Sequence, residues 1–338
     1  MADAVTDSIN SFRYDNLVDT EKDMDLLYYH CARVGYPKCA LANQTGETTA
    51  AGVKQRVLNI TQSLYHSPLP VIGPYPEVIE YSDIKNLIFL GLYSPIQSFP
   101  AITDLLADVE KGNGTKFAQL LRPQHSFYCP VNQPGDSGRD IRALNNDAQT
   151  AIACTDGDDQ SFLDKAHFVE HFKRLDKLSP SVGAIWSTIR MQCVHFTTRA
   201  QHRFEGPWFG NTSHPILLMG NTADPVTPVR NAVKMAKGFK DAVALTQDSP
   251  GHCTLSAPSK CTIDYVRRYF QTGELPPKDA FCEADEVPFG STEEEGVYNA
   301  EAAEFKAEIE GLHAALRSAQ GGPMNVARGS NMLLGEML

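Results

Sequence analysis

The sequence has 338 residues, of which 42% are hydrophobic and 21% charged, and this is an ordinary globular composition with enough apolar material for a sizeable core. The formal net charge of −11 gives the protein no electrostatic reason to bind nucleic acid or anionic lipid. No apolar run reaches the length of a membrane span, and the first residues lack the basic and apolar stretches of a secretory signal. We therefore expect neither nucleic acid nor a membrane among its partners.

Cysteines and glycosylation sequons are nevertheless typical of a secreted protein. The eight cysteines are even in number, and none stands in a C-x-x-C motif of the zinc-ribbon or thioredoxin type. Four Asn-x-Ser/Thr sequons, at Asn43, Asn59, Asn113 and Asn211, agree with passage through an oxidising compartment. Free buried thiols in a cytosolic protein are the alternative. Because no signal peptide precedes these features, we expect a chain of secreted lineage that begins late.

Helical patterns dominate residues 1–205, which we interpret as a helical lid. Amphipathic periodicity, with N-cap residue types ahead of it, predicts helices over 19–31, 53–64, 82–88, 98–109 and 160–178. Four prolines between 68 and 76 predict a loop. The polar stretch 123–148, rich in Gly, Pro and Asn, predicts a second and longer loop.

The pattern changes near residue 206. A short apolar run over 216–219, ended by a Gly220-Asn221 turn, is typical of a buried parallel strand, and a helix is predicted over 229–239. A second short strand over 242–245 and a helix through Tyr269 follow. Alternating strands and helices predict an α/β segment with a parallel sheet over 206–290. With so few strands, the first would lie at an exposed edge, so we also expect poor solubility or self-association.

Residues 291–338 form a third region. It begins with an acidic stretch and continues as a Glu/Lys/Ala-rich segment with a narrow apolar stripe, which consists of Phe305, Ile309, Leu312 and Leu316. We predict an amphipathic helix that packs on the body or on a partner, followed by a disordered tail.

Two loops in the α/β segment carry residue types suited to catalysis. Asp224 follows the first predicted strand and His252 follows the second, and in parallel sheets functional groups collect at the carboxyl ends of strands. A carboxylate can fix the tautomer of an imidazole and stabilise its charged form. In α/β-hydrolases the chain order is serine, acid, histidine, so Asp224 and His252 fit the last two positions. An Asx-turn aspartate and an unpartnered loop histidine are the alternatives.

Here the sequence resembles a known family. PILLMGNTADPVTPVRNA, followed by DSPGHCTLSAPSKCTIDYVRRYFQTGELPPKDAFCE, is similar to the C-terminal domain of tripeptidyl aminopeptidases and their fungal relatives. The resemblance implies an α/β-hydrolase sheet after a helical lid, release of short peptides or residues from peptide N-termini, and no cofactor. It also implies triad roles for Asp224 and His252. The lid resembles the family through NLVDTEKDMDLLYYHCARVGYPKCAL and IFLGLYSPIQSFPAITDLLADVEKGNG.

The sequence departs from the family in one respect, because it contains no G-x-S-x-G nucleophile motif. Loss of a triad nucleophile removes most of the rate acceleration, on the order of 10⁶-fold in a serine protease. We therefore expect this chain alone to be a poor or inactive hydrolase. It would be a shortened gene product, a remnant, or one half of a site that a complementing N-terminal half completes.

Two other motifs offer alternative sites. Ser137 lies in a G-D-S-G sequence, as in chymotrypsin-like proteases, but no all-β pattern accompanies it, so a polar turn is favoured. His167, Glu170 and His171 form an H-x-x-E-H motif, which in zinc peptidases binds metal from one helix face. No third ligand is evident, and a solvated face is favoured, so we assign no metal.

The cysteines allow several pairings, which sequence alone cannot decide. The family pattern implies Cys261–Cys282. Cys31–Cys39 would close a short loop, Cys154–Cys193 would staple the lid, and Cys253 would pair with Cys129.

Three functions follow from the sequence. The first is a serine hydrolase of the aminopeptidase type that acts on peptides. The second is a non-catalytic binding or scaffold protein derived from such a hydrolase, and the third is a zinc peptidase that uses His167, Glu170 and His171.

Overall fold

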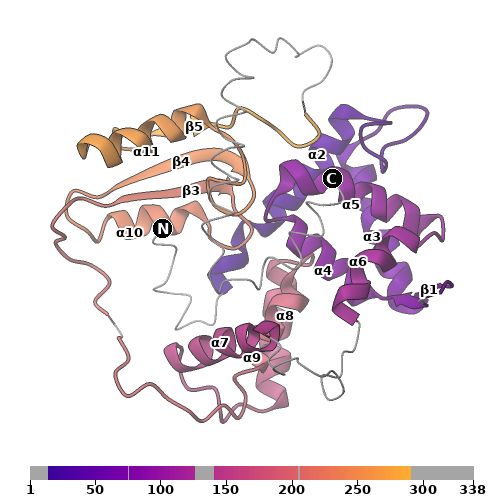
Figure 1. Ribbon diagram of the computed structural model, residues 1–338, viewed down its shortest axis with the longest axis horizontal. Coiled ribbons are helices and arrows are strands. Elements are labelled where there is room, and N and C mark those ends of the chain that lie inside the picture. The colour runs from indigo at the N-terminus through magenta and orange to yellow at the C-terminus, as the bar shows by residue number, and fades with distance from the viewer. Residues whose placement is uncertain (1–13, 75, 126–140, 205, 291–338) are drawn as a thin grey trace, which may run out of the picture.

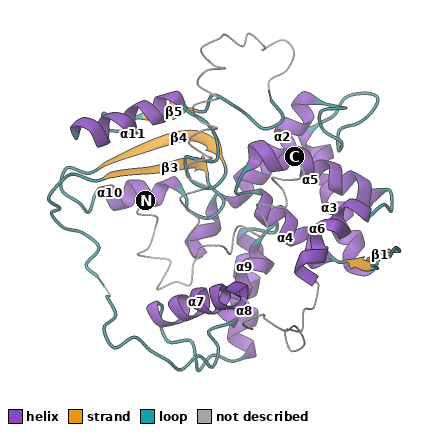
Figure 2. Cartoon of the chain, viewed as in Figure 1, coloured by secondary structure: helices purple, strands orange, loops and turns teal. Residues whose placement is uncertain are grey.

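The computed structural model describes residues 14–74, 76–125, 141–204 and 206–290 (Figure 1). Among the described residues before 205, the regular elements are helices apart from one small hairpin, and the parallel sheet belongs to the described segment after residue 205 (Figure 2). The third predicted region, with Phe305, Ile309, Leu312 and Leu316, lies outside the described residues. No helix among the described residues is long and apolar enough to cross a membrane.

The N-terminal helices have clear local causes. Thr49 caps α3 by accepting the Gly52 N–H, and Glu80 and Asp83 form a reciprocal capping box at the start of α4. Asp164 caps α8 by accepting the His167 N–H. The helical elements are η1 (Tyr14–Val18), α2 (Thr20–Val34), α3 (Ala50–His66), α4 (Tyr81–Gly91), α5 (Pro95–Glu110), α6 (Thr115–His125), α7 (Ile141–Asp156), α8 (Lys165–Leu178) and α9 (Gly183–Met191).

Two predicted loops are partly wrong. The proline-rich stretch 68–76 contains β1 (Leu69–Val71), which pairs antiparallel with β2 (Glu77–Ile79). Pro70 is tolerated there because the strands of a two-stranded ribbon are edge strands, in which one backbone N–H can be missing from the pairing. The loop predicted over 123–148 is too long at both ends, since α6 runs to His125 and α7 begins at Ile141.

The sheet consists of three parallel strands in the order β3-β4-β5 within the described residues: β3 (Leu217–Ala223), β4 (Val243–Pro250) and β5 (Phe281–Glu283). Helix α10 (Val229–Ala236) connects β3 to β4 and packs on both, and α11 (Lys260–Thr272) precedes β5 and lies beside it (Figure 1). The predicted turn at Gly220-Asn221 is wrong, because β3 continues through both residues. Gly220 is required there, as a Cβ would lie 2.9 Å from the Val229 Cα of α10. Strand β3 is the last strand on its side of the described sheet, as predicted.

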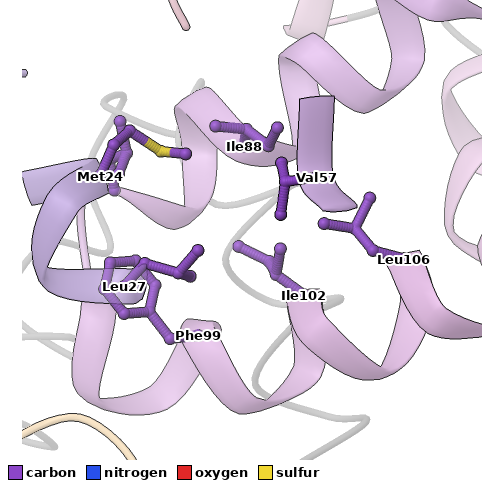
Figure 3. A pocket seen from close by; sticks show the side chains of 8 residues that line it. Met24, Leu27, Val57, Ile88, Phe99, Ile102 and Leu106 are labelled. Carbon is purple, nitrogen blue, oxygen red and sulfur yellow. The ribbon is translucent and has the colours of Figure 1, made fainter. Parts of the chain in front are cut away.

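One apolar core joins the helices. Buried side chains of α2, α3, α4 and α5 pack together around a cavity of about 10 Å³, which is at the lower limit of the volume that one water molecule needs (Figure 3). Met24, Leu27 and Phe99 lie on one side of it, and Val57 and Leu106 lie on another. This cavity is a packing gap and too small for a substrate. Val226, from the loop after β3, belongs to the same core, so the helical region and the sheet segment share it.

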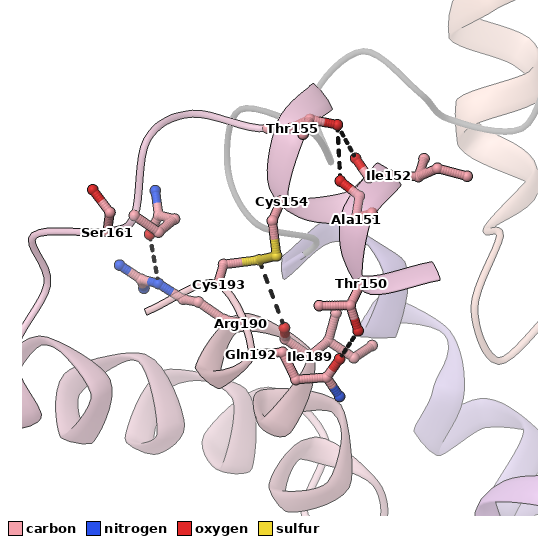
Figure 4. Close-up of a disulfide and its surroundings, with 12 residues drawn as sticks. Thr150, Ala151, Ile152, Cys154, Thr155, Ser161, Ile189, Arg190, Gln192 and Cys193 are labelled. Carbon is pink, nitrogen blue, oxygen red and sulfur yellow. Dashed lines mark hydrogen bonds between the residues drawn. A yellow bond between two sulfur atoms is a disulfide. The ribbon is translucent and has the colours of Figure 1, made fainter. Parts of the chain in front are cut away.

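Three of the four predicted disulfides are confirmed. Cys31–Cys39, Cys154–Cys193 and Cys261–Cys282 are bonded, with Cα–Cα distances of 5.2, 5.2 and 5.5 Å. Cys154–Cys193 joins the end of α7 to the segment after α9, next to hydrogen bonds from Thr150 to Gln192 and from Arg190 to Gln160 (Figure 4). The fourth prediction, Cys129–Cys253, involves a residue outside the described part of the chain.

Candidate active site

The two predicted loops lie at one edge of the sheet. Strands β3 and β4 are parallel, so their carboxyl ends lie side by side, and Ala223 at the end of β3 pairs with Pro250 at the end of β4. Asp224 is the first residue after β3, and His252 is the second after β4. The register of the sheet therefore brings together two residues that are 28 positions apart in the sequence.

Asp224 and His252 are in direct contact. The His252 Nδ1 atom lies 3.2 Å from both carboxylate oxygens of Asp224. It also lies 3.2 Å from the Thr227 hydroxyl oxygen. Because a carboxylate can only accept hydrogen bonds, this contact requires a proton on Nδ1 and leaves Nε2 as the basic nitrogen of the neutral ring.

The Asp224 carboxylate is held on every side. It has no exposed surface. One oxygen accepts the backbone N–H groups of Val226 and Thr227, at 2.9 and 2.7 Å. The other accepts the Thr227 hydroxyl at 2.7 Å and the Cys253 N–H at 2.8 Å. This network fixes the direction in which the carboxylate faces His252.

The same contacts keep Asp224 ionised. Burial alone would raise the pKa of the Asp224 carboxyl. The hydrogen bond and charge of His252, with the N–H groups of Cys253 and Val226, outweigh burial and hold that pKa below its ordinary value. Asp224 is thus an anion at neutral pH, as an acid that stabilises an imidazolium must be.

His252 is positioned by its own loop and by the segment between α4 and α5. Its backbone N–H donates to the Tyr93 carbonyl at 3.1 Å, and the Tyr93 ring meets the imidazole edge-to-face with centroids 5.0 Å apart. Gly251 has φ of +99°, and a Cβ there would lie 2.6 Å from atoms of Pro95 and Ser256, so only glycine fits. The His252 side chain is 29% exposed, so the imidazole can be reached from outside while Asp224 cannot.

Two buried amides, which the sequence analysis missed, hold the histidine loop. Asn221 and Gln247 are register partners on β3 and β4, and both are fully buried. The Asn221 amide donates to the carbonyls of Gly251 and Cys253 and to the Ser256 hydroxyl, at 2.7 to 3.0 Å. The Gln247 amide donates to Ser249 and to the carbonyls of Thr254 and Ala257. Both strands also carry other polar side chains, so the sequence offered no signal that singles out these two amides.

The H-x-x-E-H motif does not form a site. His171 is 2% exposed, and burial, with the nearby Arg190 and Arg174 charges, lowers its pKa to about 4. His167 is exposed and bonds to Asp164 at 2.7 Å. Across the described part of the chain, no three His, Cys, Asp or Glu side chains are grouped so that they could hold a metal ion. Ser137 lies outside the described residues.

A comparison with protein families agrees with this geometry. A family model described as TAP-like protein matches residues 179–282, which include both loops. Residues 179–282 form a TAP-like C-terminal domain of the α/β-hydrolase type. This TAP-like domain takes in β3, β4 and both connecting helices, together with α9, which lies within the predicted lid. A search of curated proteins gave no match.

Proposed function

We propose that Asp224 and His252 of the TAP-like domain are the acid and the base of a serine hydrolase that acts on peptides. The observation that carries the proposal is the contact between the His252 Nδ1 atom and a fully buried, ionised Asp224. The imidazole would take the proton of a serine hydroxyl during attack on the scissile carbonyl and return it to the leaving amine. Asp224 would hold the ring in one tautomer and stabilise the imidazolium.

The serine itself has to come from outside these 338 residues, because the sequence contains no G-x-S-x-G motif. The chain alone is then an inactive or weakly active hydrolase, and a complementing polypeptide that carries the serine and the oxyanion-hole donors restores the site. Release of short peptides or residues from peptide N-termini is supported only by the likeness to the TAP-like family and by the extensive helical region before the domain.

A complementation experiment tests this proposal. The purified chain is mixed or co-expressed with the N-terminal, G-x-S-x-G-bearing half of a TAP-like hydrolase, and hydrolysis of chromogenic peptides with free N-termini is measured. We expect no labelling of the chain alone by a fluorophosphonate probe, and amidase activity in the mixture that falls on the order of 10⁴-fold in Asp224→Asn. The matched control is Asp248→Asn, which changes an exposed aspartate of β4. Strong labelling of the chain alone, or activity indifferent to Asp224 and His252, would contradict the proposal.

A second candidate is a non-catalytic binding protein built on a hydrolase fold. The observation that favours it is again the absence of a nucleophile motif from the sequence. Binding of peptides with free N-termini by the chain alone, with an affinity unchanged by His252→Ala and with no restored hydrolysis, would favour this role.

A further inference from the structure

Helix α2 places a second carboxyl group, that of Asp23, against the acid loop, which consists of residues 224–228 between β3 and α10. Thr20, in the first turn of α2, donates its hydroxyl to the Pro225 carbonyl at 2.7 Å, and Asn16 just before the helix donates to the Val226 carbonyl at 2.6 Å. Asp23 is three residues after Thr20 and so lies on the same helix face. Its side chain has no exposed surface, and it is close enough to Asp224 to interact with it electrostatically.

The surroundings of Asp23 suit an uncharged acid and not a carboxylate. Neither carboxyl oxygen has a hydrogen-bond partner among the described residues. The nearby Gly251 N–H, which donates to the Ala223 carbonyl at 3.1 Å, acts to lower the pKa of Asp23 but does not outweigh the causes that raise it. Burial and then the charge of Asp224 raise the pKa of Asp23 well above its ordinary value. An isolated buried carboxylate would cost far more than a neutral acid.

The described charged groups around α2 do not compensate Asp23. Lys22 bonds to Asp19, and Lys54 of α3 bonds to Asp25 on another side of the helix. Glu21 accepts hydrogen bonds from Ser179 and Ser181. Among the loops at the carboxyl ends of the strands, the charge that raises the pKa of Asp23 is that of Asp224, which is itself in contact with His252.

We propose that Asp23 is a positioning residue of the Asp224–His252 pair, which in its protonated form packs behind the acid loop and on ionisation repels Asp224. The inference rests on the proposed function, since it concerns the same pair. Protonated Asp23 packs behind the loop without placing a second negative charge beside Asp224. When Asp23 loses its proton, two carboxylates face each other inside the protein, which loosens the loop and changes the electrostatic environment of His252.

The direction of the stability effect follows from proton linkage. The folded state keeps the Asp23 proton to a higher pH than the unfolded state does, so the folded state binds more protons in the window between the two pKa values. The free energy of unfolding therefore falls as pH rises through this window. The isosteric variant Asp23→Asn, which cannot ionise, is free of this loss.

The test uses the full chain and needs no enzymatic activity, so its outcome is independent of whether any peptide is cleaved. Urea unfolding midpoints of wild type, Asp23→Asn and Asp25→Asn are measured from about pH 5 to about pH 9, with the disulfides intact. We expect the midpoint of Asp23→Asn to exceed that of wild type by an amount that grows with pH. Asp25→Asn makes the same substitution at an exposed site on the same helix, and its difference from wild type should stay nearly constant. A pH-independent difference for Asp23→Asn would overturn the inference.

A second measurement follows His252 directly in wild type and in the same two variants. The ring resonances of His252, followed by NMR over the same pH range, should show, besides the titration of the ring itself, an additional inflection at the pH where Asp23 ionises beside Asp224. Asp23→Asn should remove this inflection, and Asp25→Asn should keep it. Its absence from the wild-type titration, or its persistence in Asp23→Asn, would show that Asp23 does not act on the pair.

Discussion

At the scale of single residues, the site depends on hydrogen bonds that the sequence pattern does not reveal. Asp224 and His252 could be predicted because the loop sequences around them and their order along the chain match the acid and the histidine of α/β-hydrolases. Asn221, Gln247 and Asp23 could not, because each stands beside other polar residues of its element and its role depends on which carbonyls or carboxylates lie opposite. Asn221 alone makes three hydrogen bonds to the loop that carries His252.

Asn221 gives a prediction at this scale. In Asn221→Ala the buried carbonyls of Gly251 and Cys253 lose the amide donor, so we expect the free energy of unfolding to fall by about 2–3 kcal/mol. The adjacent Thr222→Ala removes one hydrogen bond to the exposed Asp248 and should cost less than about 1 kcal/mol. Urea unfolding of both variants provides the measurement, and equal losses would show that Asn221 does not hold the loop.

At the scale of elements, the helices and strands follow closely from their local patterns, and the exceptions have physical reasons. The helix predicted over 53–64 extends to Ala50–His66 because Thr49 caps it. The small hairpin β1–β2 escaped prediction because short, proline-containing edge strands lack the usual alternation of polar and apolar residues. Strand β5 has three residues and is too short for its sequence to show an alternation of polar and apolar side chains. Its parallel pairing with β4 and the Cys261–Cys282 disulfide hold it in place.

The packing of α2, α3 and α5 gives a prediction at the element scale. Leu106 is fully buried beside the small cavity of Figure 3. Leu106→Ala should therefore enlarge this cavity, because the surrounding side chains do not fill it even in the wild-type protein. We expect a loss of about 3–5 kcal/mol in the free energy of unfolding. Leu58, on the outer side of α3, is 46% exposed, and Leu58→Ala should cost less than about 1 kcal/mol. Similar midpoints for the two variants in urea would refute this account of the core.

At the scale of the whole molecule, the helical region and the sheet segment meet at the loops that carry Asp224 and His252. Val226 packs in the helical core, Thr20 and Asn16 bind the backbone of the same loop, and Tyr93 contacts His252. The class of fold could be predicted from the alternation of strands and helices after residue 206. The docking of α2 on the acid loop could not, because it depends on contacts between residues more than 200 positions apart. The three disulfides and the exposed sequon asparagines at 43, 59, 113 and 211 are consistent with an extracellular protein.

The central claim is that Asp224 holds His252 in the tautomer of a catalytic base. Nitrogen NMR of the ¹⁵N-labelled full chain reports which ring nitrogen of His252 carries the proton. At a pH where the ring is neutral, we predict a protonated Nδ1, and in Asp224→Asn we predict loss of that preference, because the amide can also donate to the ring. A neutral His252 with its proton on Nε2 in the wild-type protein would contradict the account.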